Sequence, residues 1–524
     1  SDVGTMDVKK VLKAKRQAAR DAEAYRRRVA IVLAVGCALI ARPVMYWVTQ
    51  DENQFARFSL PLTNVSATDS RSPGNWAQIP IIFDNSTDEE SHKRFIVEKV
   101  ISSGVAVVIK GSRFPDVLAR WGIEYFEKRC PKHVTRLADV KVIKQGGAFL
   151  HYDSNNKAMI QQGFESAQEA QQHRHYTYKQ VEIEKFWKAM KSTKKRDVAV
   201  AAESNNDEVK LALTASVNDF CGGVLDADLK GSWSEHFVHP EQKHNLHIHR
   251  ATRNLWMGVP GVVTSWHYDT YTNFFIHLSG SKRVLVQPPS AYYNLHFYPS
   301  LHPYYRKSQI VWEEFSQNNT QQMEDRFPGW SDHQIQAVTL EPGDVLYLPS
   351  YWNHRVETVG YKSSVSLSFW SSRNDTTVSL RMLNRLKSII DSQQDLSRGL
   401  DFFQGVMCSL IESVFPTVRQ RKAFFDNIII HQYLNSIGQP IDLSQCNRCE
   451  APATLKRDDD SSLIVRPEIQ IIVSEMLSEL EKTPDDVKPI VIGFVIEKGI
   501  NKIFFGNVIA DLCFISECLA KHLI

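Results

Sequence analysis

The feature that most constrains the fold is a series of short β-type segments between residues 254 and 370. β-Branched and aromatic residues dominate each segment, and glycine or proline separates one segment from the next. Strands at this density, without alternating helices, indicate a sandwich or a barrel. The clearest expected strands are 255–263, 273–278, 283–287, 345–348 and 364–369, and an earlier buried strand is expected at 105–109. We therefore predict a mainly β core.

A short motif inside this β-rich stretch places two types of metal ligand on one strand. His267 and Asp269 flank Tyr268. Residues two apart on a strand point to the same face, so both side chains can reach one metal ion. An H-x-D motif alone is weak evidence, because a chain of this composition would contain roughly one by chance. A second copy, His151-Tyr152-Asp153, has no matching histidine downstream, and we interpret it as structural.

A distant histidine strengthens the first motif. The turn Glu341-Pro342-Gly343-Asp344 leads into the strand at 345–348, and His354 follows closely. Strands far apart in sequence can be neighbours in a closed barrel, so His354 can approach His267 and Asp269. Two histidines and one carboxylate form the facial triad that suits iron(II) and leaves coordination positions open. A zinc hydrolase is the weaker interpretation, because catalytic zinc sites more often show three histidines or an H-E-x-x-H helix.

Several motifs occur in the order that is typical of one oxygenase family. They are Leu255-Trp256-Met257-Gly258, Thr264-Ser265-Trp266-His267-Tyr268-Asp269, Asn273-Phe274-Phe275, Ser279-Gly280-Ser281-Lys282-Arg283, Gln287-Pro288-Pro289, Trp352-Asn353-His354 and Ser366-Leu367-Ser368-Phe369-Trp370. In this order they resemble the JmjC-domain (cupin) oxygenases. Among these, the small JmjC hydroxylases are the most similar, such as the asparaginyl hydroxylase that inhibits hypoxia-inducible factor. The resemblance is strong over 254–370, fainter back to 78, and absent over the amino terminus.

That resemblance implies a double-stranded β-helix (the cupin or JmjC jelly roll) with flanking helices, and a dioxygenase that uses Fe(II) and 2-oxoglutarate. The implied iron ligands are His267, Asp269 and His354. Lys282 would bind the distal carboxylate of 2-oxoglutarate through a charge-assisted contact. Thr264 would donate its hydroxyl to the same carboxylate, and Asn273 would shape the cosubstrate pocket. The implied reaction couples oxidative decarboxylation of 2-oxoglutarate to hydroxylation of a substrate C–H bond.

Ordinary structural roles compete with these assignments. Lys282 could be a surface lysine of a hairpin, and Thr264 and Asn273 could be common polar residues of a strand and a turn. The family pattern is also incomplete. In the asparaginyl hydroxylase a tyrosine on an earlier strand touches the cosubstrate, whereas the best counterpart here, 211–214, holds no tyrosine. Ser368 stands where that enzyme has an asparagine. Both departures concern the geometry of substrate and cosubstrate more than iron binding.

The predicted function is hydroxylation of a protein side chain. An RNA-modifying JmjC oxygenase is less favoured, because 62 Lys and Arg against 59 Asp and Glu leave a net charge of only +3. A nucleic-acid binder usually shows a basic face in its domain charge, so a nucleic-acid partner is not expected. From a different class comes a non-catalytic cupin that serves as a structural subunit of a membrane complex. A scaffold, however, has no chemical reason to keep the triad and Lys282.

Helical periodicity marks the regions around the β core. A charged, Gln-rich stretch at 161–196 indicates a helical insertion, with Phe186, Trp187 and Met190 at helical spacing and a solvated loop at 192–196. Beyond 375, apolar stripes at 380–390, 464–481 and 504–522 indicate helices that could also form a homodimer. The first stripe comprises Leu380, Met382, Leu383, Leu386, Ile389 and Ile390. Cys446 and Cys449 form the one C-x-x-C pair, which we interpret as unpaired thiols or a local disulfide.

The amino terminus carries an apolar stretch at 29–48, long enough to cross a bilayer, interrupted only by Arg42 and Pro43. Tyr46 and Trp47 stand where an aromatic belt is expected, and Arg42 can extend its charge to the interface. A buried core helix and a cleaved presequence are the alternatives. We predict a transmembrane helix that binds the protein to a membrane.

The flanking charges predict the orientation of that helix. Residues 1–28 hold nine Lys or Arg, whereas 49–70 hold only Arg57. The positive-inside rule then keeps the short tail in the cytosol and places the catalytic part in the lumen of the secretory pathway, with the inner mitochondrial membrane as an alternative. The predicted organisation is a tail at 1–28, an anchor at 29–48, a linker at 49–75, an oxygenase domain at 76–374 and a helical region at 375–524.

Overall fold

The computed structural model describes most of the chain beyond residue 75. The described residues are 76–112, 120–130, 136–143, 148–149, 153, 176–192, 194–204, 209–229, 236–237, 252–310, 320–330, 335–371, 374–392, 396–434, 436, 446, 455–457, 463–503 and 512–524. All of them except Cys446 belong to one compact unit formed by 70–441 and 448–524. Within these residues no helix is both long and apolar enough to cross a membrane. The predicted anchor at 29–48 lies outside them.

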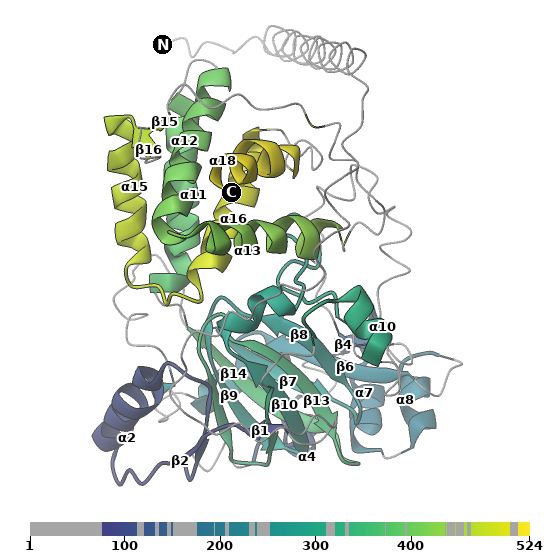
Figure 1. Cartoon of the computed structure of the whole chain (residues 1–524). Helices are drawn as coiled ribbons and strands as arrows, with labels where there is room; N and C mark the ends of the chain where they lie inside the picture. The colour runs from purple at the N-terminus through teal and green to yellow at the C-terminus, as the bar shows by residue number, and fades with distance from the viewer. Residues whose placement is uncertain are drawn as a thin grey trace, which may run out of the picture. The chain divides into compact units, whose positions relative to one another are not determined.

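The core consists of two facing β-sheets (Figure 1). The five-stranded sheet has the order β1 (Ala77–Gln78), β11 (Gln336–Leu340), β10 (Ser281–Gln287), β13 (Asn353–Val359) and β8 (Val263–Tyr268). The nine-stranded sheet has the order β2 (Ile81–Phe83), β3 (Val107–Lys110), β12 (Val345–Leu348), β9 (Thr272–Ser279), β14 (Ser364–Ser371), β7 (Thr252–Gly258), β6 (Lys210–Ser216), β4 (Leu137–Ile143) and β5 (Tyr176–Glu182). From β7 to β10 and from β11 to β14, successive strands alternate between the sheets, which is the connectivity of the predicted cupin-type jelly roll.

Side chains alternate across the nine-stranded sheet and fill two separate cores. One face of β9 and β12 carries Phe275 and Leu346, which pack between the sheets against Val284 and Val286 of β10. The opposite face carries a larger apolar cluster that includes Phe274. That cluster packs on the flanking helices α4 (Ile123–Arg129), α7 (Ile183–Lys191), α8 (Lys195–Ala201) and α9 (Val224–Leu229). The space between the sheets is therefore the barrel interior.

One predicted strand is two strands in the structure. The segment 255–263 is divided between β7, which ends at Gly258 in the nine-stranded sheet, and β8, which begins at Val263 in the five-stranded sheet. Pro260-Gly261 provides the turn, and Gly261 adopts φ +79°. Because this dipeptide strongly favours a turn, the expectation of one continuous strand over 255–263 was wrong.

The predicted helix over 161–196 is also partly wrong. Residues 161–175 lie outside the described residues, but Tyr176–Glu182 forms strand β5, paired along its whole length with β4. Alternating aromatic and β-branched residues fit a strand, and pairing with β4 outweighs the helical appearance of the charged neighbours. The predicted helical face itself is present, because Phe186, Trp187 and Met190 are buried together on α7. The predicted loop at 192–196 is shorter than expected, because helix α8 already begins at Lys195.

The carboxy-terminal region is helical, as predicted. Its long helices are α11 (Asn374–Ser392), α12 (Leu396–Val414), α13 (Val418–Asp426), α15 (Pro467–Leu480) and α16 (Lys488–Ile503), coloured green to yellow in Figure 1. Met382, Leu383 and Leu386 are buried along α11, but Leu380 is 51% exposed and does not belong to the predicted stripe. Shorter elements are α2 (Glu89–Phe95), α10 (Thr320–Arg326), η9 (Asn427–Leu434), η11 (Phe514–Ala520), α18 (Lys521–Leu523) and the hairpin β15 (Leu455–Arg457) and β16 (Leu463–Val465).

A disulfide joins Cys130, at the end of α4, to Cys221, in the turn that follows β6. The link closes a long loop that contains β4, β5, α7, α8 and β6. Cys446 of the C-x-x-C pair is also disulfide-bonded, so it is not a free thiol. Cys408 is buried on α12.

Candidate metal and cosubstrate site

The structure brings His267, Asp269 and His354 together at one end of the barrel. His267 is near the end of β8, Asp269 follows that strand, and His354 is the second residue of β13. The antiparallel register of β8 and β13 places His267 directly opposite His354. One potential ligand atom from each of the three residues lies within 4.8 Å of the other two. A single metal ion could therefore contact all three side chains.

Hydrogen bonds to the backbone orient both imidazoles. Nδ1 of His267 lies 2.8 Å from the carbonyl oxygen of Ser265, and Nδ1 of His354 lies 3.0 Å from that of Trp352. A carbonyl oxygen only accepts, so each Nδ1 carries the hydrogen and each Nε2 presents a lone pair. Nε2 of His354 is 3.9 Å from Oδ2 of Asp269. This arrangement, with the second ring nitrogen anchored, is usual for histidines that bind metals.

Burial also keeps the ligand set in the protonation states that a metal requires. Desolvation lowers the pKa of His354, and that of His267 well below its usual value, so both imidazoles stay neutral at pH 7. Burial by itself would raise the pKa of Asp269. The neighbouring imidazoles and the cations of Arg306 and Lys307 outweigh it and hold that pKa below its usual value. Two neutral imidazoles and a carboxylate fit iron(II) well.

Two cationic residues next to the triad were not identified from the sequence. Arg306 places Nη1 3.2 Å from Oδ1 of Asp269, and its backbone carbonyl accepts from the Tyr268 amide at 3.2 Å. Lys307 forms a backbone bridge with His267 and is only 5% exposed. Both lie in the segment that follows β10. This segment has no regular strand pattern, so its sequence does not indicate which strand it will lie against. Two charges directly after the aromatic residues Tyr304 and Tyr305 were the signal that could have revealed them.

Lys282, which the family resemblance implies as a cosubstrate ligand, lies in the barrel interior. It shares a face of β10 with Val284 and Val286, is 6% exposed, and has its Nζ 5.1 Å from the centroid of the Phe275 ring. Burial lowers its pKa to about 7. Among the described residues its ammonium has no hydrogen-bond or carboxylate partner. A buried ammonium in this condition is costly unless an anion meets it.

The registers of β8, β13 and β10 define three parallel rows of side chains. The first row holds His267, His354 and Val286, and the second holds Thr264, Val356 and Val284. Lys282 and Thr358 form the third row, about 13 Å of strand from the first. Thr264, half-buried on β8, is thus placed between the triad and Lys282. A dicarboxylate could extend along this path from the metal ligands to the lysine.

Asn273 and the second H-x-D copy complete the predicted residues. Asn273 is buried on β9, and its Oδ1 has no hydrogen-bond partner among the described atoms. Of the copy His151-Tyr152-Asp153, only Asp153 is described, and its amide donates to the carbonyl oxygen of Pro303. Residues 211–214, which lack a tyrosine, lie in β6. Ser368 accepts a hydrogen bond of 2.9 Å from Nε1 of Trp256.

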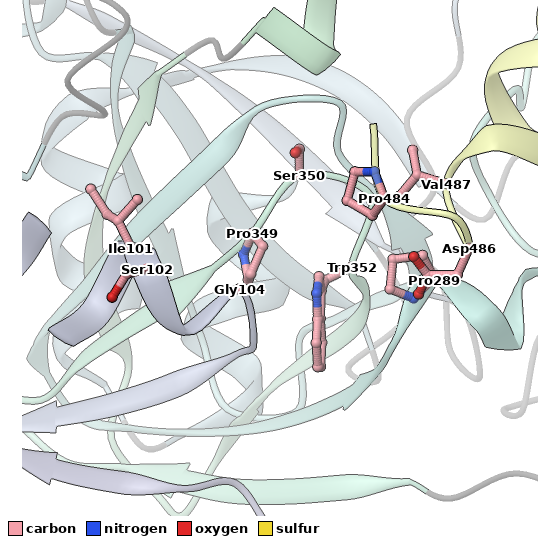
Figure 2. Close-up of a pocket in the computed structure, with 10 residues that line it drawn as sticks. All are labelled: Ile101, Ser102, Gly104, Pro289, Pro349, Ser350, Trp352, Pro484, Asp486 and Val487. Atoms are coloured by element: carbon pink, nitrogen blue, oxygen red, sulfur yellow. The ribbon is translucent and has the colours of Figure 1, made fainter. Parts of the chain in front are cut away.

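A separate cavity of about 360 Å³ lies beyond Trp352 (Figure 2). Its walls come from the helix η2 (Ile101–Ser103), the turn between β12 and β13, and the turn before α16. Trp352 lines the cavity, while its backbone carbonyl holds His354. None of the three triad residues lines this cavity, so we do not assign it to the metal site. Its lining residues are Ile101, Ser102, Gly104, Pro289, Pro349, Ser350, Trp352, Pro484, Asp486 and Val487.

Comparison with known proteins gives a consistent assignment for this fold. Residues 92–377 match the family model described as a cupin-like domain. Lysine-specific demethylase JMJ31 of Arabidopsis thaliana is 31% identical over 129 residues, which cover 23% of this chain and 21% of that protein. HSPB1-associated protein 1 of Homo sapiens is 36% identical over 118 residues, 22% of each chain.

A third relative is a hydroxylase by name. The bifunctional peptidase and (3S)-lysyl hydroxylase JMJD7 of Homo sapiens is 30% identical over 130 residues, which cover 22% of this chain and 40% of that protein. The chain thus matches between about a fifth and two fifths of the length of these relatives. A crystal structure of the Escherichia coli ribosomal oxygenase YcfD covers 73% of this chain and 65% of its own at 14% identity, with a TM-score of 0.26. At that TM-score the likeness does not bear on the fold.

Proposed function

The chain belongs to the family with a cupin-like domain, and from this premise we propose that it is an Fe(II)- and 2-oxoglutarate-dependent dioxygenase that hydroxylates a protein side chain. The observation that carries the proposal is the convergence of ligand atoms of His267, Asp269 and His354 within 4.8 Å, with each imidazole oriented by a contact between its Nδ1 and a backbone carbonyl. Relatives that are named as a hydroxylase and as demethylases support the oxidative class of reaction.

In this proposal the triad holds the iron, which supplies activation of oxygen when bound. Arg306 keeps the Asp269 carboxylate oriented through its 3.2 Å contact with Oδ1. Lys282 donates from its ammonium to the distal carboxylate of 2-oxoglutarate, and Thr264 donates its hydroxyl along the same path. Asn273 offers an amide to the cosubstrate pocket. The apolar side chains between the sheets, such as Phe275 and Val284, exclude water from this path.

The alternative from another class is a non-catalytic cupin that serves as a structural subunit of a membrane complex. A structural role gives no reason to bury the Lys282 ammonium away from every carboxylate of the described residues, or to anchor two imidazoles beside Asp269. An RNA-modifying oxygenase has no support from the near-neutral net charge of +3. A protein substrate therefore accounts best for the site and the composition.

An anaerobic titration with Fe(II) and then 2-oxoglutarate tests the proposal without knowledge of the substrate. A visible charge-transfer band of the iron–cosubstrate chelate is expected in the wild type. It should be absent in His267→Ala and should require about 10- to 100-fold more 2-oxoglutarate in Lys282→Met. His302→Ala serves as the control, because His302 is buried but is not a member of the triad. A well-folded, metal-free wild type that gives no band would overturn the enzyme assignment and favour the structural subunit.

The predicted location enters the proposal as well. We place the amino terminus in the cytosol and the oxygenase domain in the secretory lumen. The disulfide between Cys130 and Cys221 supports an oxidising compartment, because cytosolic proteins rarely keep structural disulfides. In that compartment the glycosylation enzymes could act on the sequons that begin at Asn64, Asn85, Asn318 and Asn374. A full-length protein whose mobility does not change with endoglycosidase, and whose cysteines are reduced in cells, would contradict a secretory location.

A further inference from the structure

A second lysine lies in the barrel interior, on the sheet opposite Lys282. Lys141 is on β4, where it pairs with Ala212 of β6, and it is only 6% exposed. Its Nζ donates a hydrogen bond of 2.7 Å to the hydroxyl oxygen of Thr214. Thr214 in turn pairs with Trp256, whose indole lies on the interior side of β7. The ammonium therefore points toward the space between the sheets.

Aromatic rings surround this ammonium without neutralising it. Nζ of Lys141 lies 3.7 Å from the centroid of the Phe149 ring and 5.5 Å from that of Trp256. Rings offer a cation partial stabilisation through their faces. No carboxylate pairs with Lys141 within the described part of the chain, and one of its three N–H groups is used by Thr214. Burial lowers its pKa to about 7, which reflects the missing counter-charge.

Strand pairing connects this position to the proposed cosubstrate path. Phe149 forms a parallel bridge with Thr264, which stands in the row between the triad and Lys282. Trp256 pairs with Ser366, and the Ser366 hydroxyl lies 3.0 Å from Nδ1 of His277. Burial lowers the pKa of His277 to about 4, and the nearby charge of Lys282 lowers it in the same direction. Lys141 and Lys282 thus approach the same interior from opposite sheets.

We propose that Lys141 is a second carboxylate-binding residue, which donates together with Lys282 to the distal carboxylate of the 2-oxo acid cosubstrate. This inference rests on the proposed function, because it requires that 2-oxoglutarate is the cosubstrate. Two lysines from facing sheets would hold one carboxylate at a fixed depth below the metal. The open N–H groups of Lys141 then gain the anion that the protein itself does not provide.

Lys141 could instead bind a carboxylate of the protein substrate. The choice of ligand distinguishes this possibility from binding of the distal carboxylate of 2-oxoglutarate. The experiment compares 2-oxoglutarate with 2-oxobutanoate, which keeps the 2-oxo acid group but has no second carboxylate. The variants are Lys141→Met and Lys141→Gln, the latter retaining a polar group for Thr214. Lys179→Met on the adjacent strand β5 is the matched control, because Nζ of Lys179 donates to the carbonyl oxygen of Ala202 at 2.8 Å. Binding is followed anaerobically by the charge-transfer band of the full-length protein.

Both Lys141 variants should bind 2-oxoglutarate about 10- to 100-fold more weakly, and they should bind 2-oxobutanoate as the wild type does. Lys179→Met should leave both affinities unchanged. Unchanged affinity for 2-oxoglutarate in the Lys141 variants would overturn this inference and leave Lys141 as a structural residue or a ligand of the substrate. An equal loss for both ligands would also overturn it, since the distal carboxylate would then not be involved. A wild type without any band would instead overturn the proposed function, and the inference with it.

Discussion

At the scale of single residues, the most informative property is cationic charge inside the barrel. Lys141, Lys282 and Lys307 are each at most 6% exposed, and burial lowers the pKa of each to about 7. The usual pKa of lysine lies near 10.4, so each ammonium binds its proton far less tightly in the folded protein than in water. An anion that enters the interior would restore the usual proton affinity. Ligand binding and protonation are therefore linked.

This linkage predicts how the affinity for 2-oxoglutarate depends on pH. Burial lowers the pKa of Lys282 to about 7, and a bound carboxylate raises that pKa. Below pH 7 the ammonium is present before binding, whereas above pH 7 binding must take up a proton. The affinity should fall by up to about tenfold per pH unit between pH 7 and 9. Charge-transfer titrations at several pH values measure it.

Lys282→Met provides the comparison. In this variant the contribution of Lys282 is absent, so the affinity should be lower at neutral pH and should depend on pH less steeply. An affinity in the wild type that stays constant, or that rises from pH 7 to 9, would show that Lys282 does not meet the carboxylate.

At the scale of elements, the turn between β9 and β10, which carries the chain from one sheet to the other, sets the position of Lys282. Gly280 stands between the two strands at φ +75°, and its carbonyl accepts from His277 Nε2 at 2.8 Å. A Cβ at Gly280 would lie 2.6 Å from the carbonyl oxygen of Ser363 and 2.9 Å from Cα of Ser364. Those atoms belong to backbone and cannot move independently of β14. The turn therefore requires glycine at this position, both for its positive φ and for the space beside Ser363 and Ser364.

Gly280→Ala should destabilise the protein by more than Gly360→Ala does. Gly360 also has a positive φ, +77°, but nothing lies within 4 Å of a Cβ there. Both variants carry backbone strain of about 1–3 kcal/mol, and only Gly280→Ala adds a steric clash. The free energies of unfolding in urea should differ by at least about 1 kcal/mol. Equal free energies would mean that the backbone at Ser363 and Ser364 moves away from Gly280 without cost.

The strands of the barrel were predictable because their composition and turns agree with their pairing. β12 has the bounds expected from the sequence, and β9, β10 and β14 extend one or two residues beyond theirs. His267, Asp269 and His354 could be predicted as a set, because the alternation of side chains along a strand limits the face to which each side chain can point. Arg306 and Lys307 escaped notice, since their proximity to Asp269 depends on a long connection rather than on a strand period. Lys141 escaped for a related reason, because its role depends on which strands become neighbours of β4.

At the scale of the whole molecule, the carboxy-terminal helices hold the segment that carries Arg306 and Lys307. The amide of Ser300 donates to Oε2 of Glu497 on α16 at 2.6 Å, and the rings of Tyr305 and Phe494 lie 5.8 Å apart. Gln309 donates to the backbone carbonyls of His431 and Gln432. A helical region remote in sequence thus contributes to the geometry around the triad. The predicted homodimer through these helices stays a prediction.

Glu497 gives the contact between these regions a pH dependence. Glu497 is 2% exposed, and burial raises the pKa of its carboxyl group to about 7, above the usual value of 4.5. The folded protein therefore favours the protonated acid. The stability that this preference contributes is fully present below pH 4.5 and is lost as the pH rises through 7. Glu497→Gln removes the titration and keeps an acceptor for Ser300.

The variant should accordingly be more stable than the wild type at pH 8, by a few kcal/mol at most, and close to it at pH 5. Thermal unfolding at the two pH values measures the difference. Glu481→Gln on the surface is the control: it keeps Glu497, so its stability should fall with rising pH as that of the wild type does. A Glu497 variant that loses the same stability at both pH values would show that the charge is stabilised in the folded state.

The register that sets His267 against His354 has a consequence for assembly. A slip of one residue between β8 and β13 would turn one of the two imidazoles to the opposite face and leave an incomplete set of ligands. Only molecules whose barrels have closed in the correct alignment can then capture an ion with all three side chains. The amount of metal bound after refolding would therefore measure the fraction of molecules in which β8 and β13 are correctly aligned.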